Sequence, residues 1–158
     1  MRNYFGREKE SSLFLSKLEK GQILFFYGVS GIGKTEFILR TINPIYEEKV
    51  HYIPCIQNLL ESEIVDNILN KLASRLQDNI SIESKIQLIL QLLKKEKIIL
   101  IIDDFHRLEN IKSSTFVSLL LVKFKNIKNQ SKIILVTNKF PTLKNNVDFI
   151  ECPIMELG

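Results

Sequence analysis

Residues 28–35 carry the chain's clearest chemical pattern, which reads G-x-x-x-x-G-K-T. Its glycines let backbone N–H groups turn inward around phosphate oxygens, because no Cβ is in the way. Lys34 offers a positive charge to the outer phosphates, and the Thr35 hydroxyl can bind Mg²⁺. The alternative is a glycine turn beside an exposed lysine, and it does not explain the Lys-Thr pair. The spacing therefore predicts a loop that binds the phosphates of a nucleoside triphosphate.

Two acidic residues, Asp103 and Asp104, form the second chemical group. They follow a run of five aliphatic residues, 98–102, that predicts a buried strand. A carboxylate at the tip of such a strand can hold Mg²⁺ directly or through water, which is the role expected for Asp103. Asp104 can orient or deprotonate an attacking water. The alternative for the pair is a helix N-cap or a solvated acidic turn.

Asn138 ends a later apolar run, 132–137, and gives a third polar strand tip. Its amide could hydrogen-bond the γ-phosphate or the water, and an ordinary turn residue is the alternative. With Lys34 and Asp104 it completes the set of residues expected to act in catalysis. Thr35 and Asp103 are the expected metal ligands.

Elements that alternate between strand and helix must position these residues. The apolar run 23–27 predicts a strand before the loop, and residues 36–41 predict a helix after it that breaks at Asn43-Pro44. Further strands are predicted at 50–55, 98–102, 132–138 and 149–152, and further helices at 11–18, 60–76, 82–95 and 116–124. Pro54 would place the second strand at or near a sheet edge.

Strands that alternate with helices imply right-handed crossovers and a parallel sheet covered on both faces. The prediction is an α/β fold with three layers, α/β/α, around a mainly parallel five-stranded sheet. Ligands of such sheets bind at the carboxyl ends of the strands. Gly28, Asp103 and Asn138 all fall there.

Composition limits the class of protein. A length of 158 residues suits one domain, and the net charge of +4 comes from lysines spread along the chain, which gives little support for a nucleic-acid partner. No signal segment or apolar stretch of spanning length appears, so no membrane partner is expected. Cys55 and Cys152 lack metal-ligand spacing and are expected to be reduced and buried, as in a cytoplasmic protein.

Three segments together resemble the nucleotide-binding core of STAND NTPases: Tyr4-Phe5-Gly6-Arg7-Glu8, residues 28–35, and the strand that ends in Asp103-Asp104. That group includes the NB-ARC, NACHT and archaeal-type AAA+-like ATPases. The resemblance implies a P-loop NTPase fold with ATP or ADP as ligand and Mg²⁺ as cofactor. It also implies that residues 1–20 lie on the adenine side, where Arg7 contacts the nucleotide. The expected nucleotide contacts are Arg7, Gly28, Val29, Ser30, Gly31, Ile32, Gly33, Lys34, Thr35 and Glu36.

The resemblance also sets expectations for domain organisation. Residues 1–158 would form one core, with the nucleotide-binding part at 21–153 and the start of a helical lid at 154–158. Related cores continue into that lid and often a winged helix, so protein partners are expected through parts beyond this chain, together with nucleotide-dependent oligomers. A core without its lid leaves the adenine side open, which predicts weak nucleotide binding and slow hydrolysis.

Several functions fit these residues. The first is a regulatory ATPase switch, in which ATP and ADP states bias a conformational equilibrium. The second is an AAA+-like ATPase that loads or remodels nucleic-acid complexes, and Asn138 resembles the AAA+ sensor where many STAND members have Arg. The third is a small-molecule kinase, although the paired aspartates favour water as the phosphoryl acceptor. A nucleotide-binding scaffold without turnover is a fourth.

Overall fold

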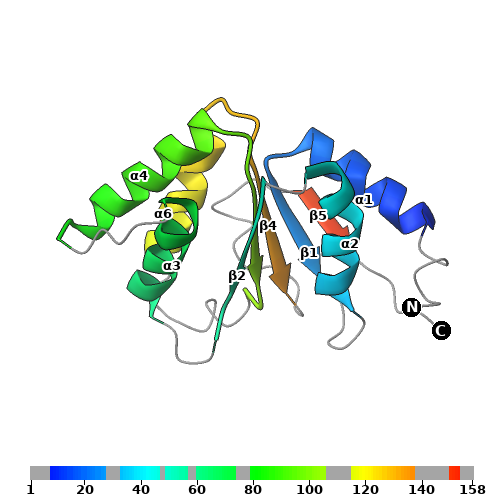
Figure 1. Cartoon of the computed structure of the whole chain (residues 1–158), viewed down its shortest axis with the longest axis horizontal. Helices are drawn as coiled ribbons and strands as arrows, with labels where there is room; N and C mark the ends of the chain where they lie inside the picture. The colour runs from blue at the N-terminus through cyan, green and yellow to red at the C-terminus, as the bar shows by residue number, and fades with distance from the viewer. Residues whose placement is uncertain are drawn as a thin grey trace.

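One parallel sheet of five strands organises the chain (Figure 1). The computed structural model describes residues 8–27, 33–46, 49–56, 60–73, 79–105, 115–137 and 150–153. The strands are β1 (Ile23–Tyr27), β2 (Val50–Pro54), β3 (Ile99–Asp103), β4 (Lys132–Thr137) and β5 (Ile150–Pro153). They are ordered β2-β3-β4-β1-β5, and every neighbouring pair is parallel. The predicted five-stranded α/β fold is confirmed, and β2 with its Pro54 lies at an edge, as expected.

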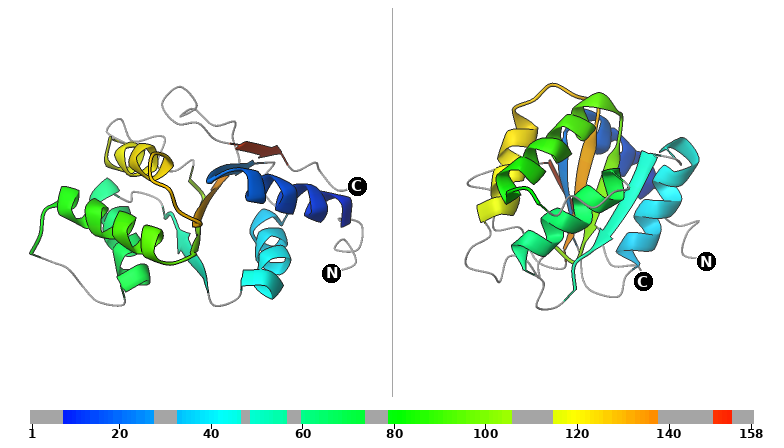
Figure 2. Two further views of the ribbon diagram at one scale, coloured as in Figure 1. Left: turned by 90° about the horizontal axis from the view of Figure 1, so that it is seen from above. Right: turned by 60° about the vertical axis from the view of Figure 1, so that its left-hand side comes forward.

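Helices cover both faces of the sheet. They are α1 (Glu8–Lys20), α2 (Lys34–Tyr46), α3 (Glu61–Ala73), α4 (Ile82–Lys95) and α6 (Thr115–Lys125). Figures 1 and 2 show α1 and α2 on one side of the sheet and α3, α4 and α6 on the other. This gives the three predicted layers.

Strand side chains alternate between two buried clusters, one for each layer of helices. The cluster under α1 and α2 contains an aromatic group in which Phe26 of β1 lies 5.2 Å from Phe14 and 5.7 Å from Phe37, measured between ring centroids. Phe37 belongs to the first turn of α2, so this packing holds the beginning of α2 against the end of β1. The larger cluster on the other face joins β3 and β4 to α3, α4 and α6.

Helix ends follow the sequence signals in some places and depart from them in others. The Ser81 hydroxyl accepts the Ser84 N–H at 3.1 Å and caps α4, which begins at residue 82 as predicted. The predicted break at Asn43-Pro44 is wrong, because α2 runs through Pro44 to Tyr46. Pro44 lies in the last turn, where its missing N–H removes a single helical hydrogen bond.

Ser131 joins three elements at the amino end of the sheet and is fully buried. Its hydroxyl oxygen accepts the Ile98 N–H at 3.0 Å and lies 2.6 Å from the Leu93 carbonyl and 2.7 Å from the Glu96 carbonyl. We expect Ser131→Ala to lower the free energy of unfolding by about 1–3 kcal/mol, because it leaves these buried groups without their partner. Urea denaturation measures the loss. The matched change at the exposed Ser16 should alter stability little, and equal effects at both positions would contradict the assignment.

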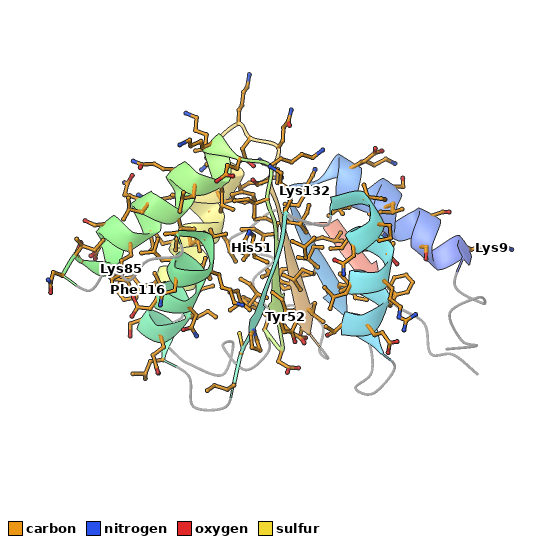
Figure 3. All side chains as sticks on the ribbon, in the orientation of Figure 1. Lys9, His51, Tyr52, Lys85, Phe116 and Lys132 are labelled. Carbon is orange, nitrogen blue, oxygen red and sulfur yellow. The ribbon has the colours of Figure 1, made fainter. Side chains whose placement is uncertain are left out.

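His51 lies on β2, half-buried (Figure 3). Burial, followed by the nearby charge of Lys71, lowers the pKa of its imidazole, while Glu96 acts in the opposite direction. The unfolded chain therefore takes up this proton at a higher pH than the folded chain does. Stability should fall as the pH drops below about 6.5, the ordinary histidine value, and level off below the folded pKa. Urea midpoints at pH 7.5 and 5.5 should show a smaller fall in His51→Gln, and an unchanged fall would exclude this source.

Candidate nucleotide-binding site

A direct hydrogen bond connects the two patterns that the sequence predicted to act together. Thr35, in the first turn of α2, donates its hydroxyl to Asp103 Oδ2 at 2.8 Å. Asp103 is the last residue of β3, an interior strand that lies next to the edge strand β2. The structure thus brings the end of the glycine-rich pattern and the first aspartate together at the carboxyl edge of the sheet.

Three donors surround the carboxylate of Asp103, which is only 9% exposed. Oδ2 accepts the Thr35 hydroxyl and the Tyr52 hydroxyl, and Oδ1 accepts the N–H of Asp104 at 2.8 Å. A buried carboxylate needs such partners to offset the loss of hydration. The network holds the carboxylate in one orientation.

Tyr52 is a site residue that the sequence reasoning missed (Figure 3). It stands on the edge strand β2, and its hydroxyl reaches across to Asp103 on the neighbouring strand. Burial, the hydrogen bond to Asp103 and the carboxylate charge all raise the pKa of the phenol, in that order of importance. The group therefore stays protonated and remains a donor. A tyrosine two residues before the end of a predicted strand is the one signal that could have identified it.

The residues at this edge fit a magnesium ion. Asp103 offers a carboxylate and Thr35 a hydroxyl, which are the hard oxygen ligands that Mg²⁺ prefers. Protein sites for Mg²⁺ usually supply one or two such groups and leave the other positions to water and phosphates. Within the described ranges, no cluster of three or more His, Cys, Asp and Glu side chains could form a fuller cage. The donor set agrees with a metal that is completed by a bound nucleotide.

Asp104 follows in a left-handed conformation, with φ at 54°. Aspartate tolerates this region of φ and ψ better than most residues. Two contacts of the next residue, Phe105, hold the turn. The Phe105 N–H donates to the Val136 carbonyl of β4 at 2.8 Å, and the buried Phe105 ring lies 5.8 Å from Phe25. These contacts fix the turn at Asp104 and Phe105, and Asp104 is partly exposed at the tip of β3.

Gly33 immediately precedes α2, the helix that carries Thr35. Its carbonyl accepts the Phe37 N–H at 2.9 Å, and its φ is 77°. A Cβ added here would meet no atom within 4 Å, so the cost of a side chain comes from the backbone alone. We expect Gly33→Ala to lower the free energy of unfolding by about 1–2 kcal/mol and to weaken nucleotide binding as the turn changes. Thermal denaturation with and without ADP measures both effects. Full wild-type stability in the variant would contradict the requirement for glycine.

The other predicted site residues are placed only in part. The Glu36 carboxylate lies 3.1 Å from Arg40 Nε on the exposed side of α2. Lys34 is the first residue of α2, but its side chain lies outside the described residues. The same holds for Arg7, Asn138 and the loop residues Gly28, Val29, Ser30, Gly31 and Ile32. Their roles stay predictions.

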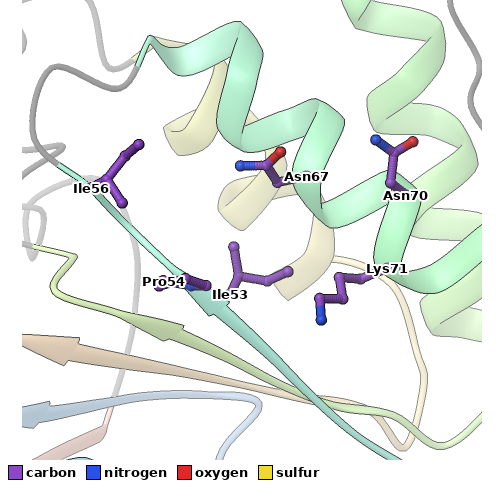
Figure 4. Close-up of a pocket in the computed structure, with 6 residues that line it drawn as sticks. All are labelled: Ile53, Pro54, Ile56, Asn67, Asn70 and Lys71. Atoms are coloured by element: carbon purple, nitrogen blue, oxygen red, sulfur yellow. The ribbon is translucent and has the colours of Figure 1, made fainter.

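A separate hollow of about 410 Å³ lies between β2 and α3 (Figure 4). Ile53, Pro54 and Ile56 line one side of it, and α3 supplies Asn67, Asn70 and Lys71. Ile53 packs into the cluster under α3, whereas Tyr52 packs on the face of α1 and α2. The hollow is therefore on the other side of the sheet from Thr35 and is not part of the candidate site.

Solved structures with the same fold bind DNA or belong to ATPases. A chain of Drosophila ORC bound to DNA aligns with a TM-score of 0.64 and 13% identity over 99% of this chain and 93% of that one. The ORC1 protein of Aeropyrum pernix in complex with DNA aligns at 0.67 with 17% identity, over 93% of this chain and 45% of the other. The Walker-type ATPase of Pyrococcus abyssi aligns at 0.69 with 14% identity, over 94% and 53%. The chain thus spans about half the length of the two archaeal proteins.

At these identities the likeness establishes the fold alone. A search of curated protein sequences finds no match. Among the described residues, no helix is both long and apolar enough to cross a membrane.

The sequence profile of a family described as an ATPase domain predominantly from Archaea matches residues 4–139, which is most of the chain. The chain therefore belongs to this archaeal-type ATPase family and shares the fold of the ORC1 and Walker-type ATPase structures.

Proposed function

We propose that this domain binds ATP with Mg²⁺, hydrolyses it slowly, and acts as a regulatory switch of the STAND type. The observation that carries the proposal is the 2.8 Å hydrogen bond between Thr35 and Asp103. A hydroxyl at the start of the loop helix and a carboxylate at the end of a buried strand are the two protein groups that Mg²⁺ needs beside a nucleotide.

Each residue has a role in this proposal. The backbone of residues 28–33 and the Lys34 ammonium bind the phosphates, and Thr35 with Asp103 would hold Mg²⁺, which would neutralise phosphate charge. Asp104 accepts a proton from the attacking water, and Asn138 orients that water or the γ-phosphate. Arg7 contacts the nucleotide from the adenine side. Catalysis comes from position and charge, because no covalent intermediate is needed.

A switch requires that ATP and ADP differ in their contacts with the protein. The γ-phosphate is the group that distinguishes them, and Asp104 and Asn138 are the residues proposed to respond to it. The strand tip of Asp104 is tied to β4 through Phe105 and Val136, so a change there can reach the neighbouring strand. Partner proteins, or further copies of the chain in a nucleotide-dependent oligomer, would bind the ATP and ADP states differently.

Phosphate release by the full chain tests the proposed activity. We expect the wild type to release phosphate from ATP slowly and only with Mg²⁺, and Asp104→Asn to lose this activity. We also expect the wild type to retain ADP through purification. Phosphate that appeared on a metabolite instead of in solution would favour a kinase. Binding of ATP without any turnover would leave only a nucleotide-binding scaffold.

An ATPase that acts on nucleic-acid complexes is the second candidate. The observation in its favour is the likeness to two ORC structures that were solved with DNA, together with a net charge of +4. It predicts that DNA stimulates hydrolysis and that the stimulation falls steeply with salt, because phosphate contacts release counterions. Hydrolysis that is unchanged by DNA at low salt would favour the switch.

A further inference from the structure

We infer that Tyr52 is a positioning residue that holds the Asp103 carboxylate for Mg²⁺, a role that rests on the proposed function. The phenol hydroxyl donates to Oδ2, the same oxygen that accepts the Thr35 hydroxyl. Oδ1 accepts the Asp104 N–H. Without Tyr52, Thr35 would be the only side chain that orients this carboxylate among the contacts described above.

Strand register explains why a tyrosine can act from the sheet edge. Pro54 pairs with Asp103 and Tyr52 with Ile101, so Tyr52 and Asp103 project on the same face of the sheet. They are offset by two residues along the strands, which corresponds to about 6.6 Å. A tyrosine side chain covers that offset and a serine or threonine side chain does not. The edge strand thus supplies a long, rigid donor to the tip of its neighbour.

The ring and the hydroxyl of Tyr52 have separable tasks. The ring packs against the buried cluster under α1 and α2, beside Val50. Among the residues that the structure describes, the hydroxyl forms a hydrogen bond only with Asp103. A Tyr52→Phe variant keeps the packing and removes only the donor, so it should fold as the wild type does.

The position of this hydroxyl predicts a selective effect on metal binding. In the proposed site the Thr35 oxygen would bind Mg²⁺ while its hydroxyl still donates to Asp103. The second donor would keep Oδ2 in place when the metal binds. Partners that orient a metal ligand in this way typically affect metal affinity by about 10–100-fold when removed. Nucleotide phosphates that bind without metal do not use this carboxylate.

Mn²⁺ reports the metal affinity directly, since oxygen sites that suit Mg²⁺ also suit Mn²⁺. In the full chain with saturating ADP, electron paramagnetic resonance of free Mn²⁺ should give a dissociation constant about tenfold higher for Tyr52→Phe than for the wild type. ADP affinity in EDTA should stay within about twofold. Thr41→Val is the matched control, because it removes a hydroxyl that donates to the Phe37 carbonyl on α2 and does not touch Asp103.

The outcomes separate this role from the proposed function. Equal Mn²⁺ affinity in Tyr52→Phe and wild type, with a clear loss in Asp103→Asn, would overturn the role of Tyr52 and leave the proposed function intact. Equal losses of Mn²⁺ affinity and of ADP affinity in EDTA would also overturn it, because they would reveal a general structural defect. A wild-type chain that binds neither ADP nor Mn²⁺ would overturn both.

Discussion

Replacing Asp103 by asparagine is expected to lower Mg²⁺-dependent ATP turnover by about a hundredfold. The amide keeps the size of the side chain but removes the negative charge that would face the metal. It also places an N–H₂ donor where the carboxylate now accepts hydrogen bonds from Thr35, Tyr52 and the Asp104 N–H. Steady-state phosphate release at saturating ATP, measured across a range of Mg²⁺ concentrations, gives both the rate and the metal requirement.

Asp66→Asn is the matched control for this change. Asp66 lies on α3 and pairs with Lys85 of α4, with 2.5 Å between Oδ1 and Nζ, on the face of the sheet opposite to Thr35. The same chemical substitution there should leave the Mg²⁺ requirement unchanged. If both variants lost turnover equally, the effect at Asp103 would be a loss of folded protein and not of a metal ligand.

Substitutions of Asp104 are expected to lower ATP turnover, and a glycine there is expected to raise the stability of the folded chain. We expect Asp104→Asn to reduce turnover by about 10²–10⁴-fold with ATP affinity preserved, because the amide cannot accept a proton from water. Asp104→Gly should lose turnover as well but should raise the free energy of unfolding by about 0.5–1 kcal/mol. The φ of 54° lies in the left-handed region, which glycine adopts without steric cost.

Single-turnover phosphate release and urea denaturation of the two variants measure these effects. Hydrolysis at the wild-type rate in both variants would remove Asp104 from the chemistry. A Gly variant less stable than the Asn variant would mean that side-chain contacts at this turn outweigh the backbone strain.

The sequence predicted the fold well because its strongest signals are local. The runs 23–27 and 98–102 are apolar at every position, which is typical of strands covered on both faces, and β1 and β3 lie there with a shift of one residue at β3. The helix predicted at 82–95 has these bounds in the structure, with Ser81 as its cap. The predicted helix break at Pro44 was wrong because a proline removes one helical hydrogen bond but does not always end the helix. Here α2 continues to Tyr46.

The sequence motifs predicted Thr35 and Asp103 as site residues, but they did not predict the surrounding side chains. The sequence could predict Thr35 and Asp103 as ligands of one metal ion because each lies in a motif that follows a predicted buried strand. Tyr52 could not be added, because its role depends on β2 lying next to β3. Strand order and register are set by packing of whole helices against the sheet, and the local sequence does not state them.

Calorimetric titration of the full chain with ATP in Mg²⁺ tests the central claim most directly when wild type is compared with Lys34→Ala. The account predicts saturable binding of one ATP by the wild type. It predicts affinity at least about tenfold weaker in the variant, because the lost charge-assisted contact with phosphate is worth about 1.5–3 kcal/mol. Equal affinity in the two proteins, or no binding by the wild type, would contradict the assignment of residues 28–35 as the phosphate-binding loop.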